Sequence, residues 1–175
     1  WIKLNLVVTC GRNLESEAEI EIKKILEENA SEESEILKTG MRGILTVQTK
    51  MDAIKFVDYV KKKINEEPWS IRYCLRIIPI QHVTVTDLTE IKQSVADLKD
   101  IIQKEDSYRI TVENRNSDIS SMEVISEVAK TIPNKVSLEN PDWVIQIEIF
   151  GNKTGVSILK KNTIFSLEKA KRNLE

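Results

Sequence analysis

ENPDWVIQIEIFGNKTGVSILKK, residues 139–161, is the stretch around which the chain is organised. In residues 143–149 apolar side chains alternate with others, and Gln146 and Glu148 point away from the apolar side. An alternation with period two predicts a half-buried β-strand. Residues 151–155 have a glycine at each end and predict a hairpin connection, because glycine adopts positive φ without strain. Residues 156–159 then form the expected return strand.

The composition describes a folded chain with a heavily charged surface. It has 175 residues, of which 41% are hydrophobic and 31% charged, with a net charge of −2. This balance argues against a generally basic nucleic-acid binder, so such a role would require cations gathered on one face. No apolar run is long enough to span a membrane and no signal-peptide pattern is present. We therefore expect a cytoplasmic protein.

The first eighty residues predict a β-α-β-β-α-β order. Strands are expected at 2–9, 35–38, 44–48 and 70–80, and helices at 14–29, with Asn13 as N-cap, and at 53–64. This order is that of a ferredoxin-like unit, in which two helices cover one face of a four-stranded antiparallel sheet. The glutamates between positions 15 and 35 are expected to lie on a solvated helix face.

A second unit is expected to begin near His82. Asp87 and Ser120 each precede a glutamate by three residues and open an apolar stripe at helical spacing, which predicts two capped helices. Residues 108–115 alternate and predict a strand between these helices. The predicted fold is therefore α+β, with a ferredoxin-like domain at 1–81 and a small α/β domain at 82–175. The polar tail from 162 is expected to form a short helix or to fray.

The sequence shows little sign of catalysis. One histidine and two cysteines make no cluster at metal-ligand spacing, and no phosphate-binding glycine loop or nucleophile elbow is present. We expect no enzyme activity, no metal and no cofactor. Cys10 ends the first predicted strand and Cys74 lies near the start of the fourth, its antiparallel neighbour, so their sulfurs are expected to be close. Two reduced thiols are the favoured interpretation, and a disulfide remains the alternative.

Several segments resemble known proteins when they are read in order. Residues 8–15 (VTCGRNLE) resemble the opening of the tRNA acetylation adaptor family, and residues 40–43 are similar to its Gly-x-x-Gly loop. Residues 74–80 (CLRIIPI) resemble the segment that leads into a THUMP domain. Residues 107–116 resemble a strand of that domain, and 138–142 with Glu148 resemble its end.

This resemblance implies a tRNA-binding adaptor. A ferredoxin-like unit and a THUMP domain would together hold the acceptor stem and 3′ end of a tRNA. The chemistry would belong to a separate enzyme, namely an RNA cytidine acetyltransferase that makes N4-acetylcytidine. Two alternatives remain open. The chain could be a non-catalytic fragment or subunit of another THUMP-type tRNA-modifying enzyme, for methylation or thiolation. It could also be a small-molecule-binding ferredoxin-like protein, which predicts an apolar pocket with a few polar groups.

The RNA surface is expected to consist of cations and hydrogen-bond donors, because an A-form stem presents phosphates and 2′-hydroxyls. Arg109 and Arg115 lie an even number of residues apart, so they share a strand face, with Thr111 between them. Guanidinium groups suit bidentate contact with phosphate, and this pair is the first choice. The remaining candidates are side chains in loops and near strand ends: Asn116, Lys153, Lys160, Lys161 and, in the glycine loop, Arg42.

Overall fold

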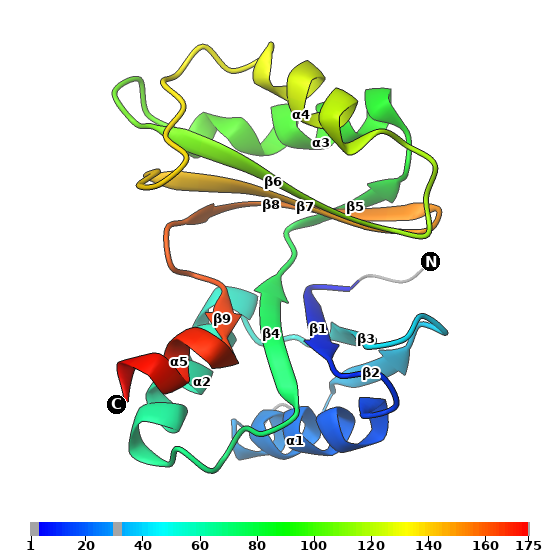
Figure 1. Ribbon diagram of the computed structural model, residues 1–175, viewed down its shortest axis with the longest axis vertical. Coiled ribbons are helices and arrows are strands. Elements are labelled where there is room, and N and C mark those ends of the chain that lie inside the picture. Colours follow the sequence, from blue (N-terminus) through cyan, green and yellow to red (C-terminus); the bar gives the residue numbers. More distant parts are fainter. Residues whose placement is uncertain (1–3, 30–32, 175) are drawn as a thin grey trace. The chain divides into compact units, whose positions relative to one another are not determined.

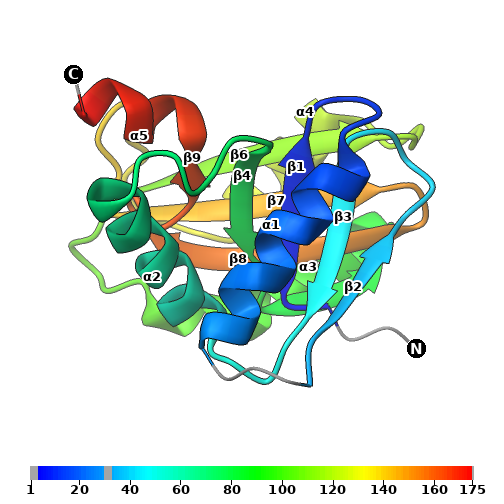
Figure 2. The same cartoon turned by 90° about the horizontal axis from the view of Figure 1, so that it is seen from below.

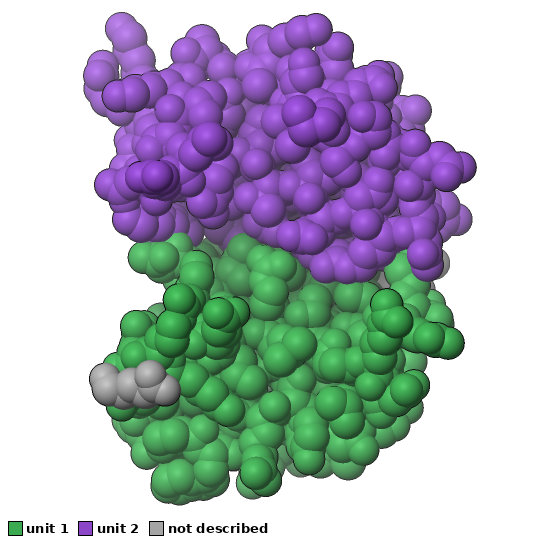
Figure 3. Space-filling view, viewed as in Figure 1, with its two compact units in different colours: residues 1–80, 162–175 green, residues 81–161 purple. Residues whose placement is uncertain are grey.

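The chain forms two compact units. The computed structural model describes residues 4–29 and 33–174. Unit 1 comprises residues 1–80 together with 162–175, and unit 2 comprises residues 81–161 (Figure 3). The predicted division near residue 81 agrees with this, but the assignment of 162–175 to the second domain is wrong. The tail belongs to unit 1 because its residues Phe165–Ser166 pair with a strand there.

Unit 1 has the predicted βαββαβ order, and its sheet runs β2-β3-β1-β4-β9. All of these pairings are antiparallel. The first four strands therefore have the ferredoxin-like order, and the tail adds a fifth strand at the edge of β4. The elements are β1 (Leu6–Cys10), α1 (Glu15–Glu28), β2 (Glu35–Lys38), β3 (Ile44–Gln48), α2 (Ala53–Glu66), β4 (Cys74–Pro79), β9 (Phe165–Ser166) and α5 (Leu167–Asn173) (Figure 1).

The apolar stripes of α1 and α2 bury against one face of this sheet (Figure 2). Asp52 is the N-cap of α2, and its side chain accepts a hydrogen bond from the Lys55 N–H at 2.9 Å. The prediction that Asn13 caps α1 is wrong, since Leu14 occupies the cap position and Asn13 has a left-handed φ of 67°. Residues 2 and 3 of the predicted first strand lie outside the described residues.

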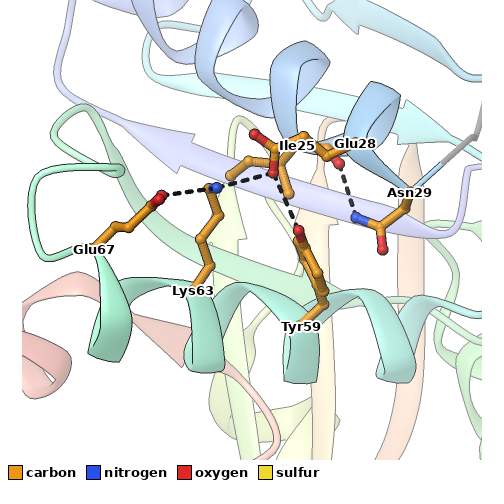
Figure 4. A network of polar contacts seen from close by, with 6 residues as sticks. All are labelled: Ile25, Glu28, Asn29, Tyr59, Lys63 and Glu67. Carbon is orange, nitrogen blue, oxygen red and sulfur yellow. Dashed lines mark hydrogen bonds and ion pairs between the residues drawn. The ribbon is translucent and has the colours of Figure 1, made fainter.

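Three glutamates of α1 make polar contacts with other segments of unit 1. Glu15 and Glu21 are half-buried, so the expected solvated face is wrong for these two, whereas Glu28 is exposed as expected. Glu15 accepts the Gly43 N–H at 2.8 Å. Glu21 accepts three successive backbone N–H groups, from residues 72–74, at 2.6, 2.9 and 3.0 Å. Glu28 accepts the Tyr59 hydroxyl at 3.2 Å and pairs with Lys63 at 2.9 Å (Figure 4). Each carboxylate thus ties α1 to a different segment of unit 1. Glu32 lies outside the described residues.

Unit 2 is a four-stranded sheet of order β5-β8-β7-β6. Strands β6 and β7 run parallel, and the other two pairings are antiparallel. Helices α3 and α4 lie on one face of the sheet (Figure 1). The two predicted caps are confirmed, because Asp87 and Ser120 accept the N–H of Glu90 and Glu123. The elements are β5 (His82–Val85), α3 (Leu88–Leu98), η1 (Lys99–Ile101), β6 (Tyr108–Arg115), α4 (Ser121–Ala129), β7 (Trp143–Phe150) and β8 (Lys153–Lys160).

The central hairpin is tighter and more buried than its sequence predicts. Phe150 pairs with Lys153, so residues 151–152 alone connect β7 to β8, and the predicted five-residue connection is wrong. Gly151 has a φ of 64°, as such a tight turn requires. All eight residues of β7 are buried, including Gln146 and Glu148, so the prediction of a half-buried strand is also wrong. The alternating side chains of β7 point to the two faces of the sheet, and both faces are buried at this strand.

The predicted proximity of the two cysteines is confirmed. Cys10 and Cys74 are partners in the β1–β4 pairing, and both are buried free thiols. Burial, with the charges of Glu15 and Glu17, raises the pKa of the Cys10 thiol to about 11. Burial also raises the pKa of Cys74. Because the thiolate is the reactive form, these raised pKa values predict low reactivity of both thiols at neutral pH.

Candidate nucleic-acid interface

The sheet of unit 2 separates the predicted contact residues into two groups. Tyr108, Trp143 and Lys160 pair side by side at one end of the sheet, whereas Arg115, Phe150 and Lys153 pair at the other. Residues 109 and 115 are six positions apart along the strand, which corresponds to roughly 20 Å at 3.3 Å per residue. The two arginines that the sequence favoured therefore belong to different ends of one strand.

Arg115 is engaged within the protein. Its Nη1 lies 3.0 Å from Oε1 of Glu148, whose side chain is fully buried, while that of Arg115 is 22% exposed. Gln146 donates to the other carboxylate oxygen at 2.6 Å. A buried carboxylate requires such partners, because burial strongly disfavours an unpaired charge. We therefore assign Arg115 a structural role, and its contact with RNA stays a prediction.

RNA contact also stays a prediction for the other candidate residues that lie away from the end of the sheet formed by Tyr108, Trp143 and Lys160. Thr111 lies half-buried near the middle of β6, and Asn116 is exposed just after that strand with a left-handed φ of 57°. Lys153 is half-buried beside the hairpin turn. Arg42 is exposed in unit 1. The amide of its neighbour Gly43 donates to the Glu15 carboxylate, so that amide is already engaged within unit 1.

A well-anchored loop, residues 138–142, forms the first end of the sheet. The Asp142 carboxylate accepts the backbone N–H and the hydroxyl of Ser107 at 2.8 and 3.2 Å. The Asp142 N–H donates to the same hydroxyl at 3.1 Å. The indole N–H of Trp143 donates to the Asp106 carboxylate at 2.8 Å, and the Gln103 N–H donates to the same carboxylate. These two hydrogen bonds lower the pKa of Asp106. These bonds fix the loop to the start of β6.

Two cations are held on this loop by neutral oxygens. Nη1 of Arg109 donates to the carbonyl of Leu138 at 2.9 Å. Nζ of Lys161 donates to Oδ1 of Asn140. Within the part of the chain that the structure describes, no acidic side chain pairs with either cation. Their side chains are thus positioned while their positive charges are not neutralised.

Lys160 lies next to Lys161 at the end of β8 and is exposed. Both lysines line a hollow whose other walls come from the anchored loop and the strand starts, namely Asp106, Asn140, Pro141, Asp142 and Trp143. We call Arg109, Lys160 and Lys161 the cation cluster. Charged hydrogen-bond donors of this kind suit phosphate oxygens, which accept strong charge-assisted hydrogen bonds. Sequence reasoning named all three residues but missed the loop oxygens that hold two of them.

Residues 85–159, almost the whole of unit 2, match the family model of the THUMP domain. The chain contains a THUMP domain. The match includes Arg109 and ends one residue before Lys160, so the two lysines of the cation cluster directly follow the matched residues. The domain therefore corresponds to unit 2 rather than to the predicted 82–175.

Known proteins of larger size share this fold. The uncharacterised protein MJ0421 of Methanocaldococcus jannaschii is 30% identical over 139 residues, which are 77% of this chain and 36% of that protein. PH1313 from Pyrococcus horikoshii has a TM-score of 0.67 at 16% identity, over 90% of this chain and 55% of that one. TrmN from Thermus thermophilus has 0.61 at 11% identity, over 89% and 45%.

A 4-thiouridine synthetase solved in complex with RNA and ATP also shares the fold. Its TM-score is 0.58 at 13% identity, over 94% of this chain and 42% of that one. The chain thus spans about a third of the curated relative and about half of the solved structures. Among residues 4–29 and 33–174, no group of acidic, histidine or cysteine side chains is arranged to hold a metal ion. No helix in these ranges is long and apolar enough to cross a membrane.

Proposed function

We propose that this chain binds tRNA through its THUMP domain and presents the tRNA to a separate modifying enzyme. In this proposal it holds the acceptor stem and 3′ end, has no catalytic activity of its own, and assists cytidine N4-acetylation. The THUMP domain and the shared fold of a 4-thiouridine synthetase solved with RNA support the role in tRNA binding. The resemblance of residues 8–15 and 40–43 to the acetylation adaptor family supports the choice of reaction.

The observation that carries the proposal is the set of hydrogen-bond partners of Arg109 and Lys161. Both donate to neutral oxygens of residues 138 and 140, and among the described residues neither forms an ion pair with a carboxylate. An RNA phosphate supplies the anionic acceptor that the protein does not. The loop contacts also restrict the two side chains before RNA arrives, which reduces the entropy lost on binding. Recognition through phosphates is independent of base sequence and suits a stem that is recognised by shape.

The direct test removes these two charges. The Arg109→Ala/Lys161→Ala variant is expected to bind tRNA about tenfold more weakly or worse, and its log–log salt slope should fall by about one for each lost phosphate contact. The matched control is Lys92→Ala/Lys130→Ala, which also removes two cations from unit 2. Both of those lysines pair with Glu127 instead. Equal binding by both variants would refute the role of the cation cluster.

A second candidate is the RNA-binding part of a different THUMP-type modifying enzyme. The observation that favours it is the shared fold of TrmN and of a 4-thiouridine synthetase, each about twice as long as the matched region. Both candidates predict tRNA binding, so they differ in the product. Mass spectrometry of tRNA from cells lacking the gene would show loss of N4-acetylcytidine for the adaptor, and loss of a methylated or thiolated nucleoside for the alternative.

The small-molecule alternative finds less support in the described residues. That alternative predicts an apolar pocket with a few polar groups, at no particular place in the fold. One hollow in unit 1 lies between α1 and β2. Its lining is mostly charged, with Glu19, Lys23, Leu26, Glu27, Ser34, Glu35 and Ile36. Four of its seven described lining residues carry a charge, which is more than the few polar groups of a typical small-ligand pocket. We therefore keep tRNA binding as the proposed function.

A further inference from the structure

A second cationic hollow lies in unit 1, between α2 and α5. Its lining includes two lysines, Lys61 of α2 and Lys169 of α5. The other polar walls are the amides of Asn65, Asn162 and Asn173 and the hydroxyl of Ser166. None of the described residues that line this hollow is acidic. The lining therefore combines two positive charges with neutral hydrogen-bonding groups, and the carboxylate whose charge acts on Lys61, that of Asp58, lies outside it.

In the absence of an anion, the positive charges of the two lysines repel each other. Burial lowers the pKa of the Lys61 ammonium, the charge of Asp58 opposes this, and the charge of Lys169 lowers it further. Asp58 is itself shared with Lys62, which lies 3.5 Å from it. A like charge and partial loss of water both destabilise the ammonium form, whereas a bound anion stabilises it.

The position of Lys61 is set by the protein. Its Nζ donates to the backbone carbonyl of Asn162. One of its three donors is thereby used, and two remain for a ligand. Asn162 has a left-handed φ of 66°, in the segment that joins β8 to β9. The lysine is thus held in the hollow by a contact that leaves most of its hydrogen-bonding capacity available.

We propose that this hollow binds a phosphate group of the RNA backbone. Phosphate is the anion whose several oxygens match two ammonium groups and surrounding amide donors. The source is assigned from the chain itself, because Asn162 of the hollow directly follows Lys161 of the cation cluster. The backbone thereby links the two sites covalently. This inference rests on the proposed function for its ligand, and it adds a contact made by unit 1.

The test replaces the two charges and keeps the aliphatic stems. Lys61→Met/Lys169→Met is compared with Lys62→Met/Lys171→Met, which removes two charges from the same helices. Lys62 and Lys171 are exposed and do not line the hollow. We expect the first variant to bind tRNA about tenfold more weakly than the second, with a salt slope smaller by about two. Thermal melting verifies folding, and removal of a disfavoured ammonium should not lower the melting temperature.

A second readout is independent of RNA. Inorganic phosphate is titrated at constant ionic strength, with chloride as the comparison, and the side-chain amide NMR signals of Asn162 and Asn173 are followed. Wild-type and Lys62→Met/Lys171→Met protein should show saturable shifts that Lys61→Met/Lys169→Met loses. The inference is overturned if phosphate and chloride act alike, or if both variants bind tRNA equally. Phosphate shifts without any tRNA binding would refute the proposed function and identify free phosphate as the ligand. Strong tRNA binding without phosphate shifts would refute only this site.

Discussion

The carboxylate of Glu21 is expected to be a major stabiliser of unit 1. It accepts the N–H groups of Arg72, Tyr73 and Cys74 at 2.6, 2.9 and 3.0 Å, where the chain enters β4. Glu21→Ala removes all three acceptors at once. The hydrogen bond from the Arg72 N–H is exposed, so this N–H can bond to water once the carboxylate is removed. The hydrogen bonds from the Tyr73 and Cys74 N–H groups are partly buried.

The magnitude follows from these two partly buried donors. A hydrogen bond to a charged group contributes about 1.5–3 kcal/mol, and the bonds share one carboxylate, so we expect a total loss of about 3 kcal/mol. For a chain of this size such a loss lowers the melting temperature by about 6–12 °C. Glu21→Gln keeps one acceptor oxygen for the two buried donors but places an amide N–H₂ against Arg72. It should lose about half as much.

The assay is urea unfolding followed by circular dichroism, with Glu27→Ala as the control on the same helix. Glu27 is exposed, and within the described residues its side chain makes no hydrogen bond or ion pair. Hydrogen exchange of the Tyr73 and Cys74 amides should accelerate in Glu21→Ala specifically. The reasoning is refuted if Glu21→Ala and Glu27→Ala differ by less than about 0.5 kcal/mol, the usual range of surface substitutions.

Three further results are expected. Gly43→Ala should destabilise unit 1 by well over 1 kcal/mol, because the glycine has a φ of 77° and an added Cβ would lie 2.6 Å from a backbone carbonyl oxygen of β1. The control is Gly40→Ala, where φ is 80° but the space around an added Cβ is open. In urea unfolding the control should lose only about 1 kcal/mol. The hydrogen bond from Lys63 lowers the pKa of Glu28 below its ordinary value of 4.5. The pair therefore stabilises the fold by about 0.5–1 kcal/mol above pH 4.5, and this contribution is lost as the pH falls through the lowered pKa. A Lys63→Met variant with unchanged pH dependence would contradict that. Arg115→Ala should lose about 2–4 kcal/mol because it removes a cation that lies 3.0 Å from a buried carboxylate, and thermal melting that matches wild type would disprove the structural role.

Local patterns predicted much of the fold because the elements of both units have regular apolar periods. The strands at 35–38 and 44–48 and the caps at Asp87 and Ser120 needed no tertiary information. The errors concern residues whose environment depends on distant segments. The two residues of β9 form a strand only because β4 offers an edge, and two residues carry no periodic signal.

The candidate site was predicted less well for the same reason. Charge and strand face selected Arg109 and Arg115 alike, since both lie on one side of β6. What distinguishes them is the partner, which is a neutral carbonyl 29 residues away for Arg109 and a buried carboxylate 33 residues away for Arg115. Glu148 itself alternates with isoleucines and so resembles a solvent-facing residue in sequence. Only the folded sheet shows that its side of β7 is buried.

The most direct test of the central claim is the salt dependence of tRNA binding by the unmodified chain. Fluorescence anisotropy with total tRNA at several salt concentrations gives the slope of log affinity against log salt. Phosphate contacts by Arg109, Lys160 and Lys161 predict a slope of about −2 to −3, at 0.7 to 0.9 for each contact. The two lysines of the hollow in unit 1 would make the slope steeper. Absence of binding at low salt, or binding that salt does not weaken, would contradict the account.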